Sequence, residues 1–357
     1  MSIVTVENLV KEFGELVAVD DASFEIEDGE FVSVLGPSGS GKSTILRMIA
    51  GFEEPTGGTI VLNGESVVGV PPFHRDVNMV FQNLALFPHL TVADNIAYGL
   101  KQSGVPKAER TERIEEMLSV VDLRGYGDRK PEQLSGGEQQ RVALARAIVN
   151  EPEIVLFDEP LASLDRKLRQ HMQVELQRIQ AETGITFMYV THDQEVAVAV
   201  SDRMILLNDG RIEQIGTPEE LYDDPVSKFV ADFIGDVNTF SGTVRNVVDD
   251  TATIELLGAT VETTIRASQA PMITEGETVA VCIRPSQLSV ANGVESGETV
   301  EIAGTVENRI YQGDGVTFMI QTDEGRLTVE DEAPYDIGDE VTVTGSWTEA
   351  YAFPGGD

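Results

Sequence analysis

Basic residues, cysteine and long apolar runs are all scarce in this sequence, and each scarcity excludes a class of protein. The 25 lysines and arginines stand against 61 aspartates and glutamates, which gives a formal net charge of −36. A surface this acidic repels phosphate backbones, so general nucleic-acid binding is disfavoured. The single cysteine, Cys282, excludes an internal disulfide and a multi-cysteine metal site. No run of about 18 apolar residues is present, so we expect no membrane-spanning helix.

Two further shortages bear on where the protein works. Residues 1–10 lack the basic start and apolar core of a signal peptide, so we expect a cytoplasmic protein that meets a membrane only through a partner. Only seven lysines occur, none after Lys228, and the acidic residues are spread along the chain instead of forming one tail. An acidic partner-binding surface is one interpretation of this charge. We favour adaptation of the whole chain to high salt, which predicts a halophilic source.

The pattern of apolar residues divides the chain of 357 residues into two domains. Residues 1–235 alternate between short apolar strands and helices, which is typical of an α/β domain with a parallel sheet. We expect strands at 31–35, 77–81, 154–157 and 186–190, and helices at 42–50, 91–100, 107–120, 138–149 and 164–182. The block at about 84–150 reads as an inserted helical subdomain. Residues 236–357 predict a small all-β barrel, with strands at 251–256, 278–283, 301–310, 316–321 and 340–344.

A glycine-rich segment predicts a phosphate-binding loop. It fits G-x-x-x-x-G-K-[ST] and lies between an expected strand and an expected helix, the context that this motif requires. The glycines let backbone N–H groups turn toward phosphates, the lysine reaches the β- and γ-phosphates, and the serine supplies an oxygen to Mg²⁺. An ordinary turn before a helix is the alternative, which the complete motif disfavours. The candidate ATP contacts are Gly36, Pro37, Ser38, Gly39, Ser40, Gly41, Lys42, Ser43 and Thr44.

An apolar run at 154–157 ends in two carboxylates, Asp158 and Glu159. Asp158 is placed to hold hydrated Mg²⁺, and Glu159 is placed to orient or polarise the attacking water. By itself this pair also fits the start of a helix. Downstream of a phosphate loop it indicates a nucleotide hydrolase.

A third motif, Leu-Ser-Gly-Gly-Glu-Gln-Gln-Arg at 134–141, resembles the signature sequence of the ABC ATPases. Ser135 with Glu138 also fits a self-capped helix start, and both interpretations can hold. The resemblance implies that Ser135, Gly136 and Gly137 contact the γ-phosphate of an ATP held by a second copy, so that the active unit is a head-to-tail homodimer. Glu138 stands where the family usually has glutamine, which leaves the role of this position open.

The remaining motifs of the family follow in order along residues 3–235. Gln82, after the strand at 77–81, resembles the residue that meets Mg²⁺ and the attacking water. The segment 161–165, Leu-Ala-Ser-Leu-Asp, resembles the loop that crosses the dimer interface and contributes Asp165. His192, after the strand at 186–190, resembles the histidine that contacts the γ-phosphate. Phe13 matches the aromatic residue that stacks on adenine.

The β-rich second domain resembles the OB-fold-like, transport-associated domain of importer ATPases, with Arg284 and Pro285 at its typical Arg-Pro pair. Ser286 stands where an acidic residue is common. Stretches at 165–173, 184–187, 233–238 and 304–306 resemble the subgroup that imports spermidine and putrescine. The resemblance implies two transmembrane permease subunits, an extracellular solute-binding protein, and a permease-binding groove at 84–92. ATP and Mg²⁺ are the expected cofactors.

Other functions stay open from the sequence alone. The same motor can serve import of iron(III), oxyanions or sugars. A soluble ABC ATPase of DNA repair or ribosomes is a second class, although the chain has one set of motifs and no long heptad run. Exporters usually fuse membrane helices to the ATPase, which this chain lacks. A regulatory role in which the β-rich domain senses a solute is a third.

Overall fold

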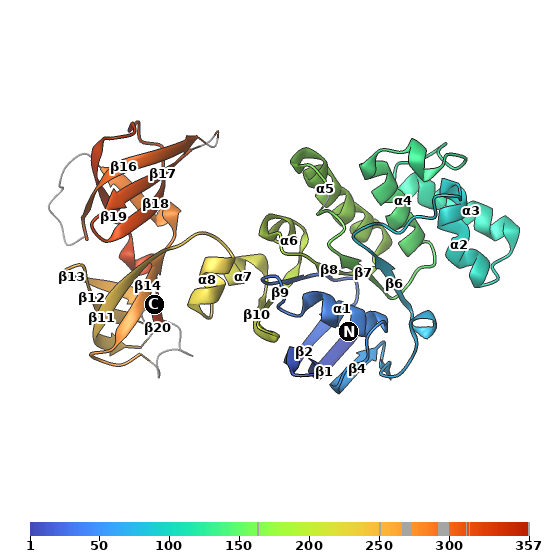
Figure 1. The fold of residues 1–357 in the computed structure, drawn as a ribbon, viewed down its shortest axis with the longest axis horizontal. Coiled ribbons are helices and arrows are strands. Elements are labelled where there is room, and N and C mark those ends of the chain that lie inside the picture. The colour runs from blue at the N-terminus through green and yellow to red at the C-terminus, as the bar shows by residue number, and fades with distance from the viewer. Residues whose placement is uncertain are drawn as a thin grey trace. The chain divides into compact units, whose positions relative to one another are not determined.

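The computed structural model describes residues 1–162, 164–249, 251–265, 273–291, 300–311, 313 and 315–355. Contacts divide the chain into two compact units, Met1–Glu220 and Leu221–Asp357 (Figure 1). In the part of the chain that is described, no helix is long and apolar enough to cross a membrane. The two units together give the expected fold class, an α/β unit followed by an all-β unit.

The centre of the first unit is a six-stranded sheet in the order β10-β9-β3-β8-β7-β6. Its strands from β9 to β6 are parallel, and β10 closes one edge antiparallel to β9. Because parallel strands end at the same edge, residues that follow β3, β7 and β8 are brought together. The strands are β3 (Phe31–Leu35), β6 (Val77–Val80), β7 (Ile154–Asp158), β8 (Thr186–Val190), β9 (Arg203–Asn208) and β10 (Arg211–Gly216).

A second sheet of the first unit is antiparallel, in the order β2-β1-β4-β5, and no strand of it was predicted. Its strands are β1 (Ser2–Phe13), β2 (Leu16–Glu27), β4 (Gly57–Leu62) and β5 (Glu65–Ser66). Helix α1 (Lys42–Ala50) shares one buried core with both sheets, in which Ile45 and Ile49 are grouped with Val4 and Leu156. This packing holds α1 in a fixed position, and with it the end of the phosphate loop that precedes the helix.

Three helices lie between β6 and β7, in the region where the sequence predicts a helical subdomain. They are α2 (Val92–Gln102), α3 (Lys107–Val120) and α4 (Gly136–Ile148), and they gather beside α5 (Arg166–Thr183) in Figure 1. A single buried cluster joins residues of these helices to Phe157 of β7 and Phe187 of β8. The other helical segments are α6 (Gln194–Val200), α7 (Pro218–Asp223), η1 (Pro72–His74) and η2 (Pro131–Gln133).

The second unit contains α8 (Lys228–Phe233), a closed barrel β11-β12-β13-β20-β14 and a five-stranded sheet β15-β19-β16-β17-β18. The barrel strands are β11 (Asn238–Val248), β12 (Thr251–Leu256), β13 (Ala259–Thr264), β14 (Thr278–Ile283) and β20 (Tyr351–Pro354). The sheet strands are β15 (Leu288–Ala291), β16 (Ile302–Tyr311), β17 (Val316–Thr322), β18 (Gly325–Asp331) and β19 (Glu340–Gly345), and two short helices are η4 (Pro285–Gln287) and η5 (Trp347–Glu349). One apolar core spans the barrel and the sheet, so both belong to one folding unit.

Arg284 organises the start of the second unit. Its buried guanidinium donates to the carbonyls of Ala231 at 2.7 Å, Gly235 at 2.9 Å and Tyr222 at 3.0 Å. Burial lowers the pKa of this group, and the ring of Tyr222 lies 4.2 Å from the guanidinium carbon. These contacts explain why residues 221–235 group with the β-rich unit, whereas the domain boundary at residue 235 stays a prediction from sequence texture.

Cys282 is buried in the second unit, where it packs with Ala231 and Phe353. Burial raises the pKa of its thiol. A buried, protonated thiol is a poor nucleophile, so Cys282 has a packing role in this unit.

Candidate functional site

The phosphate loop lies between the end of β3 and the start of α1. Gly36, Gly39 and Gly41 have φ values of 147°, 86° and 98°, in the region that side chains disfavour. A Cβ atom on Gly36 would lie 2.2 Å from the Leu207 carbonyl oxygen, and one on Gly41 would lie 2.4 Å from that of Ala18. The loop therefore requires glycine at these two positions for close approach to its neighbours as well as for its turn.

Lys42 is buried within this loop at the first position of α1. Its ammonium donates to the carbonyls of Gly36 at 2.8 Å and Pro37 at 2.7 Å. Burial lowers the pKa of Lys42, and the nearby carboxylate of Glu159 partly opposes this shift. The ammonium is thus held over the loop by weak neutral acceptors, which phosphate oxygens can replace.

Ser43 and Asp158 meet although 115 residues separate them. The Ser43 hydroxyl donates to Asp158 Oδ1 at 3.0 Å, because α1 begins beside the carboxyl end of β7. An alcohol and a carboxylate are oxygen donors of the kind that Mg²⁺ prefers. Among the residues that the structure describes, no group of three or more His, Cys, Asp or Glu side chains could hold a metal. An ion at this pair would therefore complete its shell with phosphate and water oxygens.

Glu159 and His192 form a second pair beside the first. Glu159 Oε1 lies 2.9 Å from His192 Nδ1, and the side chains are 23% and 58% exposed. The backbone of Glu159 is left-handed, with φ of 48°, and its N–H donates to Val190 at the end of β8. This arrangement turns a carboxylate and an imidazole toward the same solvent-accessible edge of the sheet.

The signature segment opens α4 in the helical block. Ser135 Oγ accepts from the Glu138 amide at 3.4 Å, and Glu138 Oε2 accepts from the Ser135 amide at 2.7 Å and hydroxyl at 2.8 Å. These bonds form a reciprocal capping box and lower the pKa of Glu138. Gly137 is tight, since a Cβ there would lie 2.8 Å from Leu168 of α5.

Three other expected site residues lie on exposed segments. Gln82 is exposed in the turn after β6. Phe13, 46% exposed at the end of β1, has the Lys11 ammonium 4.7 Å from its ring centre. Asp165 is the N-cap of α5 and accepts from the Leu168 amide at 3.0 Å. Its neighbour Ser163, part of the expected segment 161–165, lies outside the described residues.

Sequence reasoning missed Arg146, which shapes the loop after Gln82. Its guanidinium donates to the carbonyls of Leu84 at 2.9 Å and Ala85 at 2.7 Å, and both of these residues have positive φ. The ring of Phe87 lies 5.5 Å from the same guanidinium. A lone arginine within the apolar stretch at 142–149 was the available signal, because such a charge needs partners when it is buried.

Comparison with known protein families gives two matches. The model of the ABC transporter family matches residues 19–162. The model of the TOBE domain matches residues 281–352. These matches place the phosphate loop and the Asp158–Glu159 pair in the first family region, and the part of the second unit from β14 to β20 in the second.

Curated relatives match nearly the full length. A spermidine/putrescine import ATP-binding protein PotA of Rubrobacter xylanophilus is 49% identical, over 91% of this chain and 85% of its own length. The protein of the same name from Marinobacter nauticus is 45% identical, over 98% of this chain and 94% of its own. Both units are therefore within the compared region.

Two solved structures are also similar. The ATP-binding cassette MJ0796, a dimer in a post-hydrolysis state bound to ADP and Pi, has a TM-score of 0.53 at 35% identity and covers 60% of this chain and 98% of its own. The cbiO1 protein from Clostridium perfringens, part of the ABC transporter complex cbiONQ, has a TM-score of 0.59 at 27% identity and covers 62% of this chain and 91% of its own.

Proposed function

The chain belongs to the family of ABC transporter ATP-binding proteins, and from this premise we propose that it hydrolyses ATP to drive polyamine import through a membrane permease. The observation that carries the proposal is the meeting of two pairs at one sheet edge, Ser43 with Asp158 and Glu159 with His192. The names of the curated relatives support spermidine and putrescine as the solutes.

In this proposal the loop from Gly36 to Thr44 binds the phosphates of ATP. The start of α1 has no side-chain cap, so its backbone N–H groups are available to phosphate oxygens. Lys42 exchanges its loop carbonyls for the β- and γ-phosphates. Ser43 and Asp158 would hold Mg²⁺, which would supply positive charge against the phosphates. Phe13 stacks on adenine with its exposed ring.

In this proposal the second pair, Glu159 with His192, promotes hydrolysis. Glu159 orients water toward the γ-phosphate and accepts its proton, and His192 holds the carboxylate and contacts the γ-phosphate. Gln82, exposed in the turn after β6, reports the state of this site to the loop that follows it. The free energy of transport comes from the difference in affinity of the closed state for ATP and for its products.

We propose that a second copy completes each site. Ser135, Gly136 and Gly137 lie at a helix N-terminus in the helical block, and this geometry suits an anion. Asp165 and its loop reach across to the partner copy. Each ATP then lies between the phosphate loop of one chain and the signature segment of the other, in a homodimer with two such sites.

In this proposal two permease subunits bind at residues 84–92. They hold the protein at the cytoplasmic face of the membrane. An extracellular solute-binding protein acts on the chain only indirectly, through the permease. Hydrogen bonds and a ring contact hold Phe87 of this loop in place. The buried Asn95 accepts from the Phe87 amide at 2.9 Å and donates to its carbonyl at 3.1 Å. The Phe87 ring centre lies 4.5 Å from that of Tyr98, which is itself exposed.

Phe87→Asp is therefore expected to lose at least about tenfold of the uptake rate while ATP binding and basal ATP hydrolysis stay near wild type. A charge in the groove opposes desolvation against the permease and costs about 1–3 kcal/mol. Uptake and ATP hydrolysis are measured on the same preparations. Phe73→Asp is the control, since Phe73 is highly exposed on η1. Normal uptake by Phe87→Asp would remove the groove from residues 84–92.

We further propose that the chain is adapted to high salt, because a net charge of −36 destabilises a compact state by self-repulsion. Raising KCl from about 0.1 to 1 M shortens the screening length from about 10 to 3 Å. The free energy of unfolding is expected to rise by about 2 kcal/mol. This corresponds to a melting temperature about 4–8 °C higher for a domain of 150–250 residues. Thermal melts in KCl and in sucrose separate screening from excluded-solute effects. A melting temperature that is independent of KCl would contradict salt adaptation.

The transported solute is tested by uptake in cells that lack this gene. Labelled putrescine, spermidine, iron(III), molybdate and maltose are compared. Selective loss of polyamine uptake is the expected result. Loss of another solute would keep the ATP-driven motor and replace polyamine by iron(III), an oxyanion or a sugar. A full set of normal uptake rates would favour a soluble ABC ATPase outside transport.

A further inference from the structure

Arg169, in the first turn of α5, joins two loops of the site. Its Nη1 donates to Asp193 Oδ2 at 2.6 Å, and its Nη2 donates to the Leu164 carbonyl at 3.1 Å. The Arg169 and Asp193 side chains are 30% and 24% exposed, so water screens this ion pair only in part. One planar guanidinium thus holds two chain segments at a fixed separation.

Both segments flank residues of the proposed site. Asp193 follows His192 directly, and its Oδ1 caps α6 by accepting from the Val196 amide at 3.2 Å. Leu164 precedes Asp165, the N-cap of α5. A shift of Leu164 and Asp165 is therefore passed through Arg169 to the backbone that carries His192.

Tyr189 supports the same connection from inside the unit. Burial raises the pKa of its hydroxyl, which forms a hydrogen bond with the backbone of Leu161. A cavity of about 60 Å³ lies between the two loops, and Leu161, Arg169, Tyr189 and His192 are among the residues that line it. The two loops therefore lie on either side of one small cavity.

We infer that Arg169 is a positioning residue that couples the placement of His192 to the placement of the partner-facing segment of Leu164 and Asp165. The inference rests on the proposed function, in which that segment faces the second copy while His192 serves the chain's own ATP. Through Arg169, closure around one ATP aligns the Glu159–His192 pair at the other. Hydrolysis at the two sites is then cooperative.

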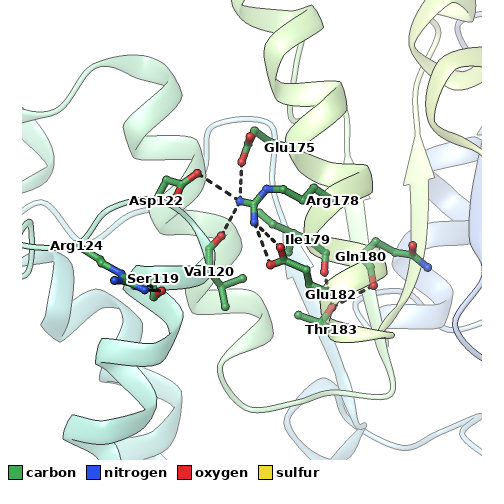
Figure 2. Close-up of polar contacts among 10 residues, drawn as sticks. All are labelled: Ser119, Val120, Asp122, Arg124, Glu175, Arg178, Ile179, Gln180, Glu182 and Thr183. Atoms are coloured by element: carbon green, nitrogen blue, oxygen red, sulfur yellow. Dashed lines mark hydrogen bonds and ion pairs between the residues drawn. The ribbon is translucent and has the colours of Figure 1, made fainter.

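The same helix offers a matched control, Arg178, whose contacts Figure 2 shows. Its guanidinium donates to Glu182 at 2.9 Å, to Glu175 at 2.8 Å and to the Val120 carbonyl at 2.7 Å. Val120 ends α3, so Arg178 ties α5 to the helical block. Arg178→Gln removes a comparable set of polar contacts from α5 but, among the described residues, none to the loop of His192 or to Leu164 and Asp165.

The test measures ATP affinity, kcat and the Hill coefficient for ATP in full-length Arg169→Gln, Asp193→Asn, the double variant and Arg178→Gln. Asp193→Asn keeps the Oδ1 acceptor that caps α6. A misplaced His192 is expected to lower kcat by about 10- to 100-fold in all three site variants, equally in the single and double variants, with ATP affinity within about twofold of wild type. Their Hill coefficients fall to about 1. Arg169→Lys is expected to restore part of kcat and of the Hill coefficient. Arg178→Gln is expected to keep both quantities at the wild-type level, even where its melting temperature falls.

Three results would overturn the inference: a wild-type Hill coefficient of 1, unchanged kcat and cooperativity in Arg169→Gln, or equal losses in Arg178→Gln. Failure of the proposed function looks different, because the wild-type chain would then not hydrolyse ATP at all.

Discussion

Glu159→Gln is expected to bind ATP with near wild-type affinity and to hydrolyse it at least about 100-fold more slowly, since a positioned general base contributes about 10²- to 10⁴-fold. The substitution keeps the shape of the side chain and removes its capacity to take a proton from water. Glu159 lies next to Asp158 at the end of β7 and pairs with His192 at 2.9 Å, so the substitution leaves the hydrogen bonds of Lys42 and Ser43 in place. ATP binding, which depends on that loop, is therefore retained.

Single-turnover hydrolysis and equilibrium ATP binding measure the two effects separately. Glu153→Gln is the control, because Glu153 precedes β7 and accepts a hydrogen bond from Asn63 on the exposed surface. Its turnover is expected to match wild type. Hydrolysis by Glu159→Gln within a few fold of wild type would transfer the general-base role to another group.

Lys42→Ala is expected to weaken ATP binding by about 10- to 100-fold. The ammonium makes two short bonds to the loop carbonyls, at 2.8 and 2.7 Å, and these are exchanged for charge-assisted bonds to phosphate. Because the loop carbonyls are given up in exchange, we count the net gain as one such bond, about 1.5–3 kcal/mol, and about 1.4 kcal/mol corresponds to a tenfold change in affinity. Lys101→Ala is the matched control, since Lys101 lies in the last turn of α2 and donates to Asp94 Oδ1 at 2.6 Å on the exposed surface. Equal ATP affinity in wild type and Lys42→Ala would exclude Lys42 from the phosphate site.

The same variant tests whether the site is shared between two chains. Both variants are made in a Glu159→Gln background. Neither Lys42→Ala nor Ser135→Arg is expected to form homodimers when ATP is added, because each homodimer would lack one half of both ATP sites. A mixture of the two contains one intact combination, Lys42 of one chain with Ser135 of the other. ATP-dependent energy transfer between donor-labelled Lys42→Ala and acceptor-labelled Ser135→Arg is therefore expected. Its absence would indicate that Lys42 and Ser135 do not serve the same ATP in trans.

The predicted elements match the structure where local pattern and core packing agree. The strand and helix around the phosphate loop, β3 and α1, have the predicted bounds, because each buries a continuous or amphipathic apolar set. Helix α4 begins at Gly136, two residues before the predicted start, because Ser135 caps it. The antiparallel sheet was missed since β1 pairs with β2 through several register shifts, and each shift breaks the two-residue alternation that reveals a strand.

The same distinction separates the site residues. Lys42, Asp158 and His192 belong to short motifs that lie at the end of a strand or follow it, so their roles could be proposed from spacing. The long-range contacts of Arg169 and Arg284 could not be predicted in this way, because Asp193 lies 24 residues from Arg169 and Tyr222 lies 62 residues from Arg284 along the chain. Only the folded backbone brings an arginine to a carbonyl that carries no sequence signal of its own.

The most direct measurement is spermidine uptake by cells that lack this gene and carry either the wild-type chain or Glu159→Gln at equal abundance. If ATP hydrolysis at this site drives import, wild type restores uptake and Glu159→Gln leaves it at the level of the deletion, although the variant still binds ATP. Uptake restored equally by both chains would contradict the account.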